Sequence, residues 1–166
     1  MGKEIITGFP PIANSEARIL ILGSMPGVQS LNAKQYYAHK QNAFWRILGE
    51  ITGLDPDAPY LNCTEKLQAD GIAVWDVLHS CERIGSLDSA IEAETANDFK
   101  LFFQRHPNIQ RVYFNGAASE RYYRIYVLPN LGHNLLLYHR LPSTSPAHAS
   151  LRYQEKLAIW KAALTE

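Results

Sequence analysis

The stretch Ala17-Arg18-Ile19-Leu20-Ile21-Leu22-Gly23 decides the fold class of this chain. It is an almost continuous apolar run, which is typical of a central strand of a parallel sheet that is buried on both faces. Gly23-Ser24-Met25-Pro26-Gly27 follows at once and breaks the strand into a loop. A buried strand with a glycine-rich loop at its carboxyl end predicts an α/β protein.

Along the rest of the chain, short apolar segments alternate with segments whose apolar residues have helical spacing. Further strands are predicted over residues 72–78, 111–114 and 135–138. Helices are predicted over residues 42–52, within 86–103, over 117–126 and over 151–164. We expect Asn42 to be the N-cap of the first of these helices and Gly53 to end it. Strands that alternate with helices predict βαβ units and a mostly parallel sheet covered by helices on both faces.

Composition limits the class of protein. The chain has 166 residues, which suits a single domain over residues 1–166. Its 46% hydrophobic and 19% charged residues exclude a disordered chain. No apolar run is long enough to span a membrane, and we expect no secretory signal at the N-terminus. Two cysteines, Cys63 and Cys81, are too few for a disulfide scaffold, so we expect buried thiols and a cytoplasmic protein.

The formal net charge of zero conceals an uneven distribution. Residues 50–98 carry eleven acidic and two basic side chains, whereas residues 1–49 carry five basic and two acidic ones. Residues 111–161 carry seven basic and two acidic side chains. A fold that brings the two basic regions together would present a positive face able to steer a polyanion. A solvated acidic helix is the simpler interpretation, so charge alone does not decide the function.

Three polar loops leave predicted strand ends. They are Gly23–Gly27, Asn115-Gly116 and Leu141–His148, and they offer a tight glycine turn, an amide, and hydroxyls with a histidine. Ligands of open parallel α/β sheets bind beyond the carboxyl ends of the strands. The sequence therefore predicts a binding site where these three loops meet.

Several common sites are excluded. The Gly23–Gly27 loop is neither a P-loop nor a GxGxxG turn, so no nucleotide cofactor is expected. His133, His139 and His148 have no metal-ligand spacing, so no metal is expected. A hydrolase that uses Ser143 or Ser145 with His148 stays open, although no GxSxG elbow is present. Tyr36 and Tyr37 could pack on the helix that follows them or offer a platform for stacking a base.

Taken in order, these motifs resemble the uracil-DNA glycosylase superfamily, and within it most closely the hypoxanthine-DNA (deoxyinosine) glycosylase branch. The resemblance runs from about Ile19 to Trp160. It is carried by Gly23–Gly27, Gln35-Tyr36-Tyr37-Ala38-His39, Asn42-Ala43-Phe44-Trp45, Phe114-Asn115-Gly116 and Leu141-Pro142-Ser143-Thr144-Ser145-Pro146-Ala147-His148. It implies a three-layer α/β/α sandwich around a four-stranded, mostly parallel sheet.

The resemblance also implies roles for individual residues. Many members place an Asp or Asn where this chain has Met25, so the water-positioning role is expected to fall to Asn42. Tyr37 corresponds to the ring that stacks on the flipped base, and Asn115 to the residue that reads the base edge. The backbone of Gly23, Ser24, Met25, Pro26 and Gly27 would lie against the base and stabilise its negative charge as it departs.

The last loop resembles the family's second motif, which enters the minor groove and contacts phosphates. Its residues here are Ser143, Thr144, Ser145, Pro146 and His148. Some relatives carry a leucine wedge in this loop, where this chain has Pro146-Ala147. Because no lysine stands at a motif position, no Schiff-base lyase step is expected and the enzyme would be monofunctional. We also expect a monomer without a cofactor. It would extrude a deaminated base from double-stranded DNA and leave an abasic site.

Besides hypoxanthine excision and the serine hydrolase, two other functions stay open. One is removal of uracil from mismatches, which the absence of an Asp in the first motif disfavours. The other is a non-catalytic nucleic-acid-binding domain on the same fold, suggested by Met25 at the usual catalytic position. Cleavage of a duplex that contains the damaged base separates these alternatives. In a prokaryote the protein would be associated with the nucleoid.

Overall fold

The computed structural model describes residues 4–166. Its main sheet has four strands in the order β3-β2-β6-β7, and all neighbouring pairs are parallel. The strands are β2 (Ile19–Gly23), β3 (Ile72–Asp76), β6 (Arg111–Asn115) and β7 (Leu137–Leu141). Leu20, Ile21 and Leu22 are fully buried at the centre, as the opening run predicts.

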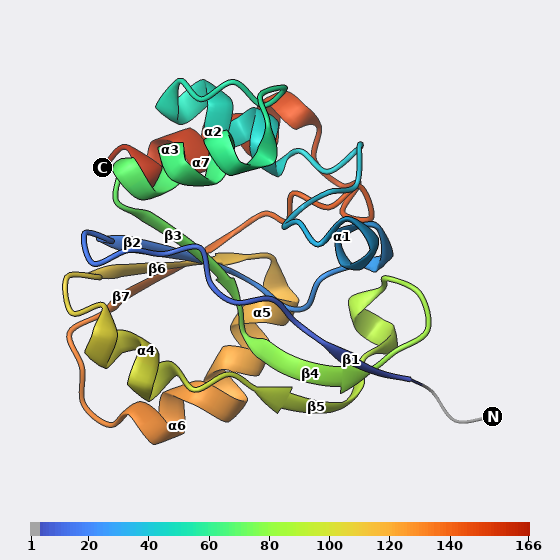
Figure 1. Ribbon diagram of the computed structural model, residues 1–166, viewed down its shortest axis with the longest axis vertical. Coiled ribbons are helices and arrows are strands. Elements are labelled where there is room, and N and C mark those ends of the chain that lie inside the picture. Colours follow the sequence, from blue (N-terminus) through green and yellow to red (C-terminus); the bar gives the residue numbers. More distant parts are fainter. Residues whose placement is uncertain (1–3) are drawn as a thin grey trace.

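Helices cover both faces of this sheet (Figure 1). On one face lie α2 (Phe44–Thr52), α3 (Tyr60–Ala69) and α7 (Tyr153–Leu164). On the other lie α4 (Phe99–Arg105), α5 (Ala117–Tyr122) and α6 (Leu128–Leu131), the last two joined by a π-helical turn over Tyr123–Val127. The short helix α1 (Val28–Ala33) follows β2. The predicted α/β/α sandwich is confirmed.

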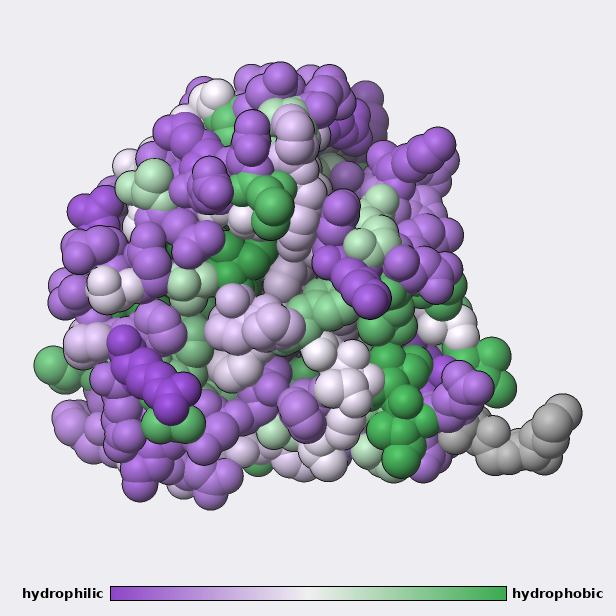
Figure 2. Space-filling view, in the orientation of Figure 1, coloured by the Kyte–Doolittle hydropathy of each residue, from purple (hydrophilic) through white to green (hydrophobic). Residues whose placement is uncertain are grey.

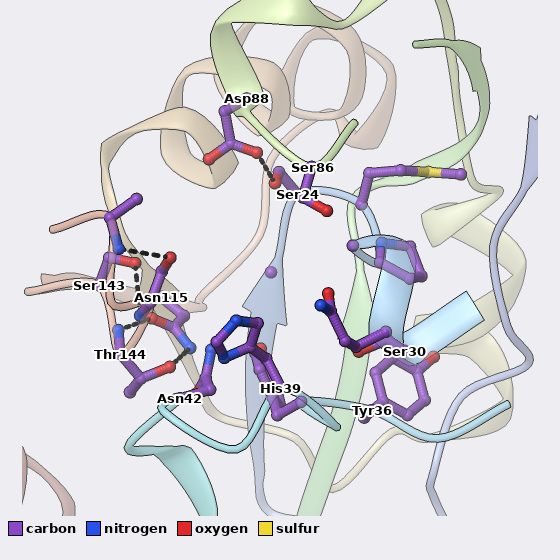
Figure 3. A pocket seen from close by; sticks show the side chains of 18 of the residues that line it. Ser24, Ser30, Tyr36, His39, Asn42, Ser86, Asp88, Asn115, Ser143 and Thr144 are labelled. Carbon is purple, nitrogen blue, oxygen red and sulfur yellow. Dashed lines mark hydrogen bonds between the residues drawn. The ribbon is translucent and has the colours of Figure 1, made fainter. Parts of the chain in front are cut away.

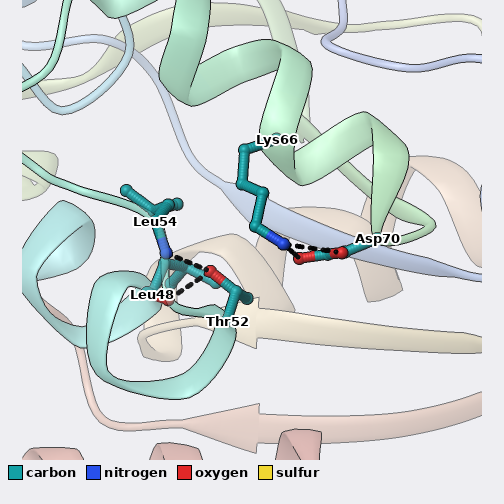
Figure 4. Close-up of polar contacts among 5 residues, drawn as sticks. All are labelled: Leu48, Thr52, Leu54, Lys66 and Asp70. Atoms are coloured by element: carbon teal, nitrogen blue, oxygen red, sulfur yellow. Dashed lines mark hydrogen bonds and ion pairs between the residues drawn. The ribbon is translucent and has the colours of Figure 1, made fainter.

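The predicted end of α2 is also confirmed. Gly53 takes the left-handed conformation with φ 83°, and its N–H donates to the Gly49 carbonyl. The Thr52 hydroxyl donates to the Leu48 carbonyl at 2.7 Å and accepts from the Leu54 N–H (Figure 4). At the end of α3, Lys66 pairs with Asp70 one turn later at 3.0 Å, as Figure 4 also shows.

A second, antiparallel sheet was not predicted. It has the order β1-β4-β5, from β1 (Ile5–Thr7), β4 (Leu78–Glu82) and β5 (Glu92–Ala96). The prediction of one strand over 72–78 is wrong at its end, because the chain bends at Val77, whose N–H donates to the Gly23 carbonyl. The chain then passes into β4 of the other sheet.

Three predicted boundaries also differ from the structure. The helix within 86–103 is confined to α4, because residues 92–96 pair with β4 and Asp98 caps α4 by accepting from the Leu101 N–H. The strand predicted over 135–138 begins at Leu137, after the Asn134 side chain turns the chain by accepting from the Leu136 N–H. The last helix begins at Tyr153 rather than at 151.

Some of the exposed apolar side chains lie in β1 and in the loop after β4. Ile5, Ile84 and Leu87 are 73%, 74% and 59% exposed. Figure 2 shows apolar surface on this side, over β1 and the loop after β4. Cys63 and Cys81 are buried free thiols, as expected. Within residues 4–166, no helix combines the length and apolar character that crossing a bilayer demands.

Candidate functional site

A pocket opens where the carboxyl ends of β2, β3 and β6 meet. Its cavity of about 240 Å³ suits a single small ring system better than a large cofactor. The loop after β2, the segment before α2 and the loop after β7 all line it (Figure 3). Every residue predicted for the site lines this pocket except His148. The predicted convergence of the three loops is therefore observed.

Gly23 lets the end of β2 pass close to the end of β3. A Cβ atom at this position would lie 2.5 Å from the Asp76 carboxylate and 3.0 Å from the Tyr37 hydroxyl. No real Cβ atom fits at 2.5 Å from an oxygen, so any side chain here would displace Asp76. The glycine thus brings the backbone of the first loop against the floor of the pocket.

Asp76 is the residue that sequence reasoning left without a role. It ends β3, is 4% exposed and lines the pocket, and its carboxyl Oδ2 atom has no hydrogen-bond partner within residues 4–166. Burial, and less strongly the Asp88 carboxylate, raises the pKa of Asp76 to about 7, although Arg83 opposes the shift. Near neutral pH this carboxyl is therefore partly protonated and can donate as well as accept a hydrogen bond. Its place as the one acidic residue in the apolar run over residues 72–78 was the available signal.

The loop between β4 and β5 closes another side of the pocket. The Ser24 hydroxyl donates to the Asp88 carboxylate at 2.5 Å, a contact across 64 residues of sequence (Figure 3). Ser86 accepts from the Val28 N–H at 2.8 Å. Sequence reasoning missed this loop, because it follows a strand of the second sheet, which was itself not predicted.

The two tyrosines have different surroundings. The Tyr36 hydroxyl donates to the Pro10 carbonyl at 2.8 Å, and its ring is buried, so Tyr36 is part of the core. The Tyr37 ring stacks on Phe44 with centroids 4.1 Å apart and also lines the pocket. Burial raises the pKa of both phenols. Tyr37 is thus a fixed aromatic wall of the cavity.

Asn42 lies at the edge of the pocket, directly before α2. Its side-chain oxygen accepts from the Phe44 N–H at 3.0 Å, but the N-cap is Ala43, so the predicted capping position was one residue early. The Ala43 N–H donates to the Thr144 carbonyl and joins this segment to the loop after β7. An amide oxygen has two lone pairs, so Asn42 retains one acceptor site and its amide protons for a water molecule.

Asn115 at the end of β6 is held by Thr144. Its amide nitrogen donates to the Thr144 hydroxyl at 3.0 Å, and its oxygen accepts from the Thr144 N–H at 2.9 Å (Figure 3). One amide proton and one lone pair remain. The pairing fixes the loop after β7 against the sheet.

The rest of the loop after β7 is held by hydrogen bonds from α7. The Lys156 ammonium donates to the Ser145 carbonyl and the Trp160 indole to the Pro142 carbonyl, both from α7. Pro146 and Ala147 are exposed at its tip. The His148 ring contacts the Ser150 hydroxyl at 3.3 Å and is paired with neither Ser143 nor Ser145. That arrangement weakens the serine hydrolase alternative. Within residues 4–166, no three His, Cys, Asp or Glu side chains gather as a metal site requires.

Comparison with known proteins identifies relatives over almost the whole chain. The family model of the uracil DNA glycosylase superfamily matches residues 10–164. A hypoxanthine DNA glycosylase of Methanosarcina barkeri is 42% identical over 116 residues, which are 69% of this chain and 73% of that protein. One from Methanosarcina acetivorans is 34% identical over 142 residues, 85% of this chain and 87% of that protein.

A solved structure agrees with the fold. A candidate uracil DNA glycosylase from Methanosarcina acetivorans, determined by solution NMR, superposes with a TM-score of 0.78 at 33% identity. The match covers 96% of this chain and 98% of that one.

Proposed function

The chain belongs to the uracil DNA glycosylase superfamily, and we propose that it removes hypoxanthine from DNA by hydrolysing the N-glycosidic bond of deoxyinosine. The observation that carries the proposal is the pocket at the sheet edge, which joins Asn42, Tyr37 and the glycine loop in one cavity. Two relatives that carry the name hypoxanthine DNA glycosylase support this choice of base.

The pocket has the groups that a flipped hypoxanthine needs. The Tyr37 ring offers a wall for stacking. The base presents a ring N–H donor beside a carbonyl acceptor. A protonated Asp76 carboxyl matches this pair, because its carbonyl oxygen accepts while its O–H donates. We therefore include Asp76 among the base-binding residues, together with the backbone of Gly23, Ser24, Met25, Pro26 and Gly27.

Asn42 is the catalytic residue of the proposal. Cleavage of the glycosidic bond produces a sugar cation and a negatively charged base. The cation is reactive enough that a well-placed water suffices, and a neutral amide can orient one. Backbone N–H groups of the glycine loop would stabilise the departing base. No lysine lines the pocket among the described residues, which supports a monofunctional enzyme that leaves an abasic site.

The loop over residues 143–148 is proposed to contact the duplex beside the lesion. Asn115 holds Thr144 in place in addition to any contact it makes with the base. We further propose that the chain acts as one domain and one monomer on double-stranded DNA. A cytoplasmic location, with the nucleoid in a prokaryote, follows from that substrate.

The test is excision from labelled duplexes that carry one deoxyinosine or one deoxyuridine. Wild type should form abasic sites at inosine, and Asn42→Ala should lower the rate by about a hundredfold. Gln41→Ala is the matched control, because Gln41 is the exposed neighbour that does not line the pocket. An equal loss of excision rate in both variants would show that Asn42 has no specific role.

Uracil excision is the second candidate, because the NMR structure is described as that of a candidate uracil DNA glycosylase. Cleavage at uracil without cleavage at inosine would favour it. DNA binding by wild type without cleavage of either duplex would support the non-catalytic alternative.

A further inference from the structure

An extruded nucleotide leaves a gap in the duplex, and base-flipping proteins fill such gaps with apolar side chains. The loop over residues 143–148 offers only Pro146 and Ala147 at its exposed tip. We propose that Leu87, on the opposite rim of the pocket, inserts into the duplex beside the extruded nucleotide. The inference rests on the proposed function and adds a second point of DNA contact, Leu87 in the loop over residues 83–91.

The position of Leu87 is the first observation. Leu87 lines the pocket and is 59% exposed. Met25 and Tyr36 line the same pocket but are 7% and 4% exposed, so they cannot reach into a duplex. Among the described residues that line the pocket, Leu87 is therefore the exposed aliphatic side chain large enough to replace a stacked base.

The second observation is that both neighbours of Leu87 are hydrogen-bonded to the segment that follows β2. Ser86 accepts from the Val28 N–H, and Asp88 accepts from the Ser24 hydroxyl. A Cβ atom on Gly27 would lie only 3.2 Å from the Ser86 hydroxyl, so the two loops are in close contact. Figure 3 shows Ser86 and Asp88 both beside Ser24.

Two further hydrogen bonds stabilise this loop, one at its start and one within it. The buried Arg83 guanidinium donates to the Pro26 carbonyl. Within the loop, the Ala90 N–H donates to the Leu87 carbonyl and closes a short helical turn. The backbone of Leu87 is thus held on both sides, while its side chain stays mostly exposed to solvent.

Exposed leucines are common, so exposure alone means little. A fixed position matters, because a wedge that is ordered before binding loses little conformational freedom when it enters the duplex. Ile84 provides the contrast within the same loop. It is 74% exposed but does not line the pocket.

The experiment measures single-turnover excision of hypoxanthine from duplex and from single-stranded DNA, for wild type, Leu87→Ala, Leu87→Met and Ile84→Ala. A wedge matters only where a base stack must be opened. Leu87→Ala should therefore lose about tenfold to a hundredfold on duplex DNA and keep the single-strand rate. Leu87→Met should recover most of the duplex rate, and Ile84→Ala should resemble wild type.

A bulky aromatic base analogue opposite the inosine gives a second readout. By filling the gap itself, it should restore the duplex rate of Leu87→Ala. An equal loss on single-stranded and duplex DNA would overturn the proposal and make Leu87 a base contact. An unchanged Leu87→Ala would overturn it as well. Failure of the proposed function is distinguishable, because wild type would then excise hypoxanthine from neither substrate.

Discussion

Asp76 shows how a single side chain can couple stability and recognition. Its carboxyl is buried and one of its oxygens has no partner in the described part of the chain, so ionisation is costly in the folded state. The unfolded chain keeps the ordinary pKa of 3.8, whereas the folded pKa is about 7. Between these values the folded state binds more protons than the unfolded state. The contribution of Asp76 to stability is therefore fully present below the lower pKa and is lost as pH rises towards 7.

Asp76→Asn should remove this pH dependence, because the amide has a similar shape and does not ionise. We expect wild type to lose up to roughly 4 kcal/mol of unfolding free energy between pH 4 and pH 7, and the variant to lose much less. Urea unfolding across this range measures both. Parallel stability curves for the two proteins would show that Asp76 is ionised throughout.

The same substitution has a consequence for recognition. An amide offers one donor and one acceptor, as the protonated carboxyl does. Asp76→Asn should therefore retain excision of hypoxanthine and keep it at pH 8, where wild type declines. Asp76→Leu, of similar size but without hydrogen bonds, should lose excision at every pH. If Asp76→Leu retained activity, Asp76 would have no contact with the base.

Gly23 and Gly27 offer a graded test of the close approach of the loops. A Cβ atom at Gly23 meets the Asp76 carboxylate at 2.5 Å, whereas one at Gly27 meets Ser86 at 3.2 Å. Gly23→Ala should therefore lower the excision rate by about a hundredfold, because it displaces the Asp76 carboxylate. Gly27→Ala should lower the rate far less. Excision rates and circular dichroism of both variants measure this. The reverse order of effects would contradict the assigned contact.

At the scale of elements, the link between β6 and the loop after β7 depends on Asn115. Thr144 is 1% exposed, so the loss of its partner leaves a buried N–H and a buried hydroxyl unsatisfied. Asn115→Ala should cost about 1–3 kcal/mol of stability, measured by urea unfolding. Asn130→Ala is the control, because Asn130 is exposed and bonds only to the Tyr126 carbonyl one turn earlier. Equal effects in the two variants would argue against a special role for Asn115.

The elements also show which parts of the fold were predictable. Leu20 to Leu22 lie in a strand that is buried on both faces. Such a strand can be recognised in a sequence because it is a nearly continuous apolar run. A helix was predicted within residues 86–103, and its extent was left open because Ile91 and Phe99 share helical spacing although they lie in different elements. Pairing of β5 with β4 is a long-range interaction that overrides local spacing.

The same distinction holds for the pocket. Its glycine loop, Asn115 and residues 143–147 were predictable, because each follows a predicted strand of the parallel sheet. Ser86 and Asp88 were not, because their contacts with Val28 and Ser24 join segments about sixty residues apart and depend on the unpredicted second sheet. Asp76 was visible as an acid within an apolar run, but the unpaired state of its Oδ2 atom among the described residues is a property of the folded molecule.

At the scale of the whole molecule, the fold brings the two basic regions of the sequence together. β2 pairs with β6, and Arg46 of α2 lies over the Tyr153 ring of α7 at 4.4 Å. The acidic region includes α3 and the β4–β5 pair. Basic side chains from both regions therefore lie on neighbouring elements, although the net charge of the chain is zero.

These neighbouring basic side chains predict salt-sensitive binding to DNA. Contacts of lysine and arginine with phosphates release counterions, so affinity falls as salt rises. Between about 50 and 200 mM salt, the dissociation constant for duplex DNA should rise at least about tenfold. Fluorescence anisotropy measures it, with the melting temperature at each salt concentration as the control for folding. A constant affinity would exclude an electrostatic contribution.

The central strand β2 has a further consequence for the backbone. It pairs with β3 on one side and β6 on the other, and Leu20, Ile21 and Leu22 are inaccessible to solvent. Their amide protons cannot exchange with deuterium through local fraying, since both neighbouring strands would have to separate first. The slowest exchange should therefore occur in β2 and report the global free energy of unfolding.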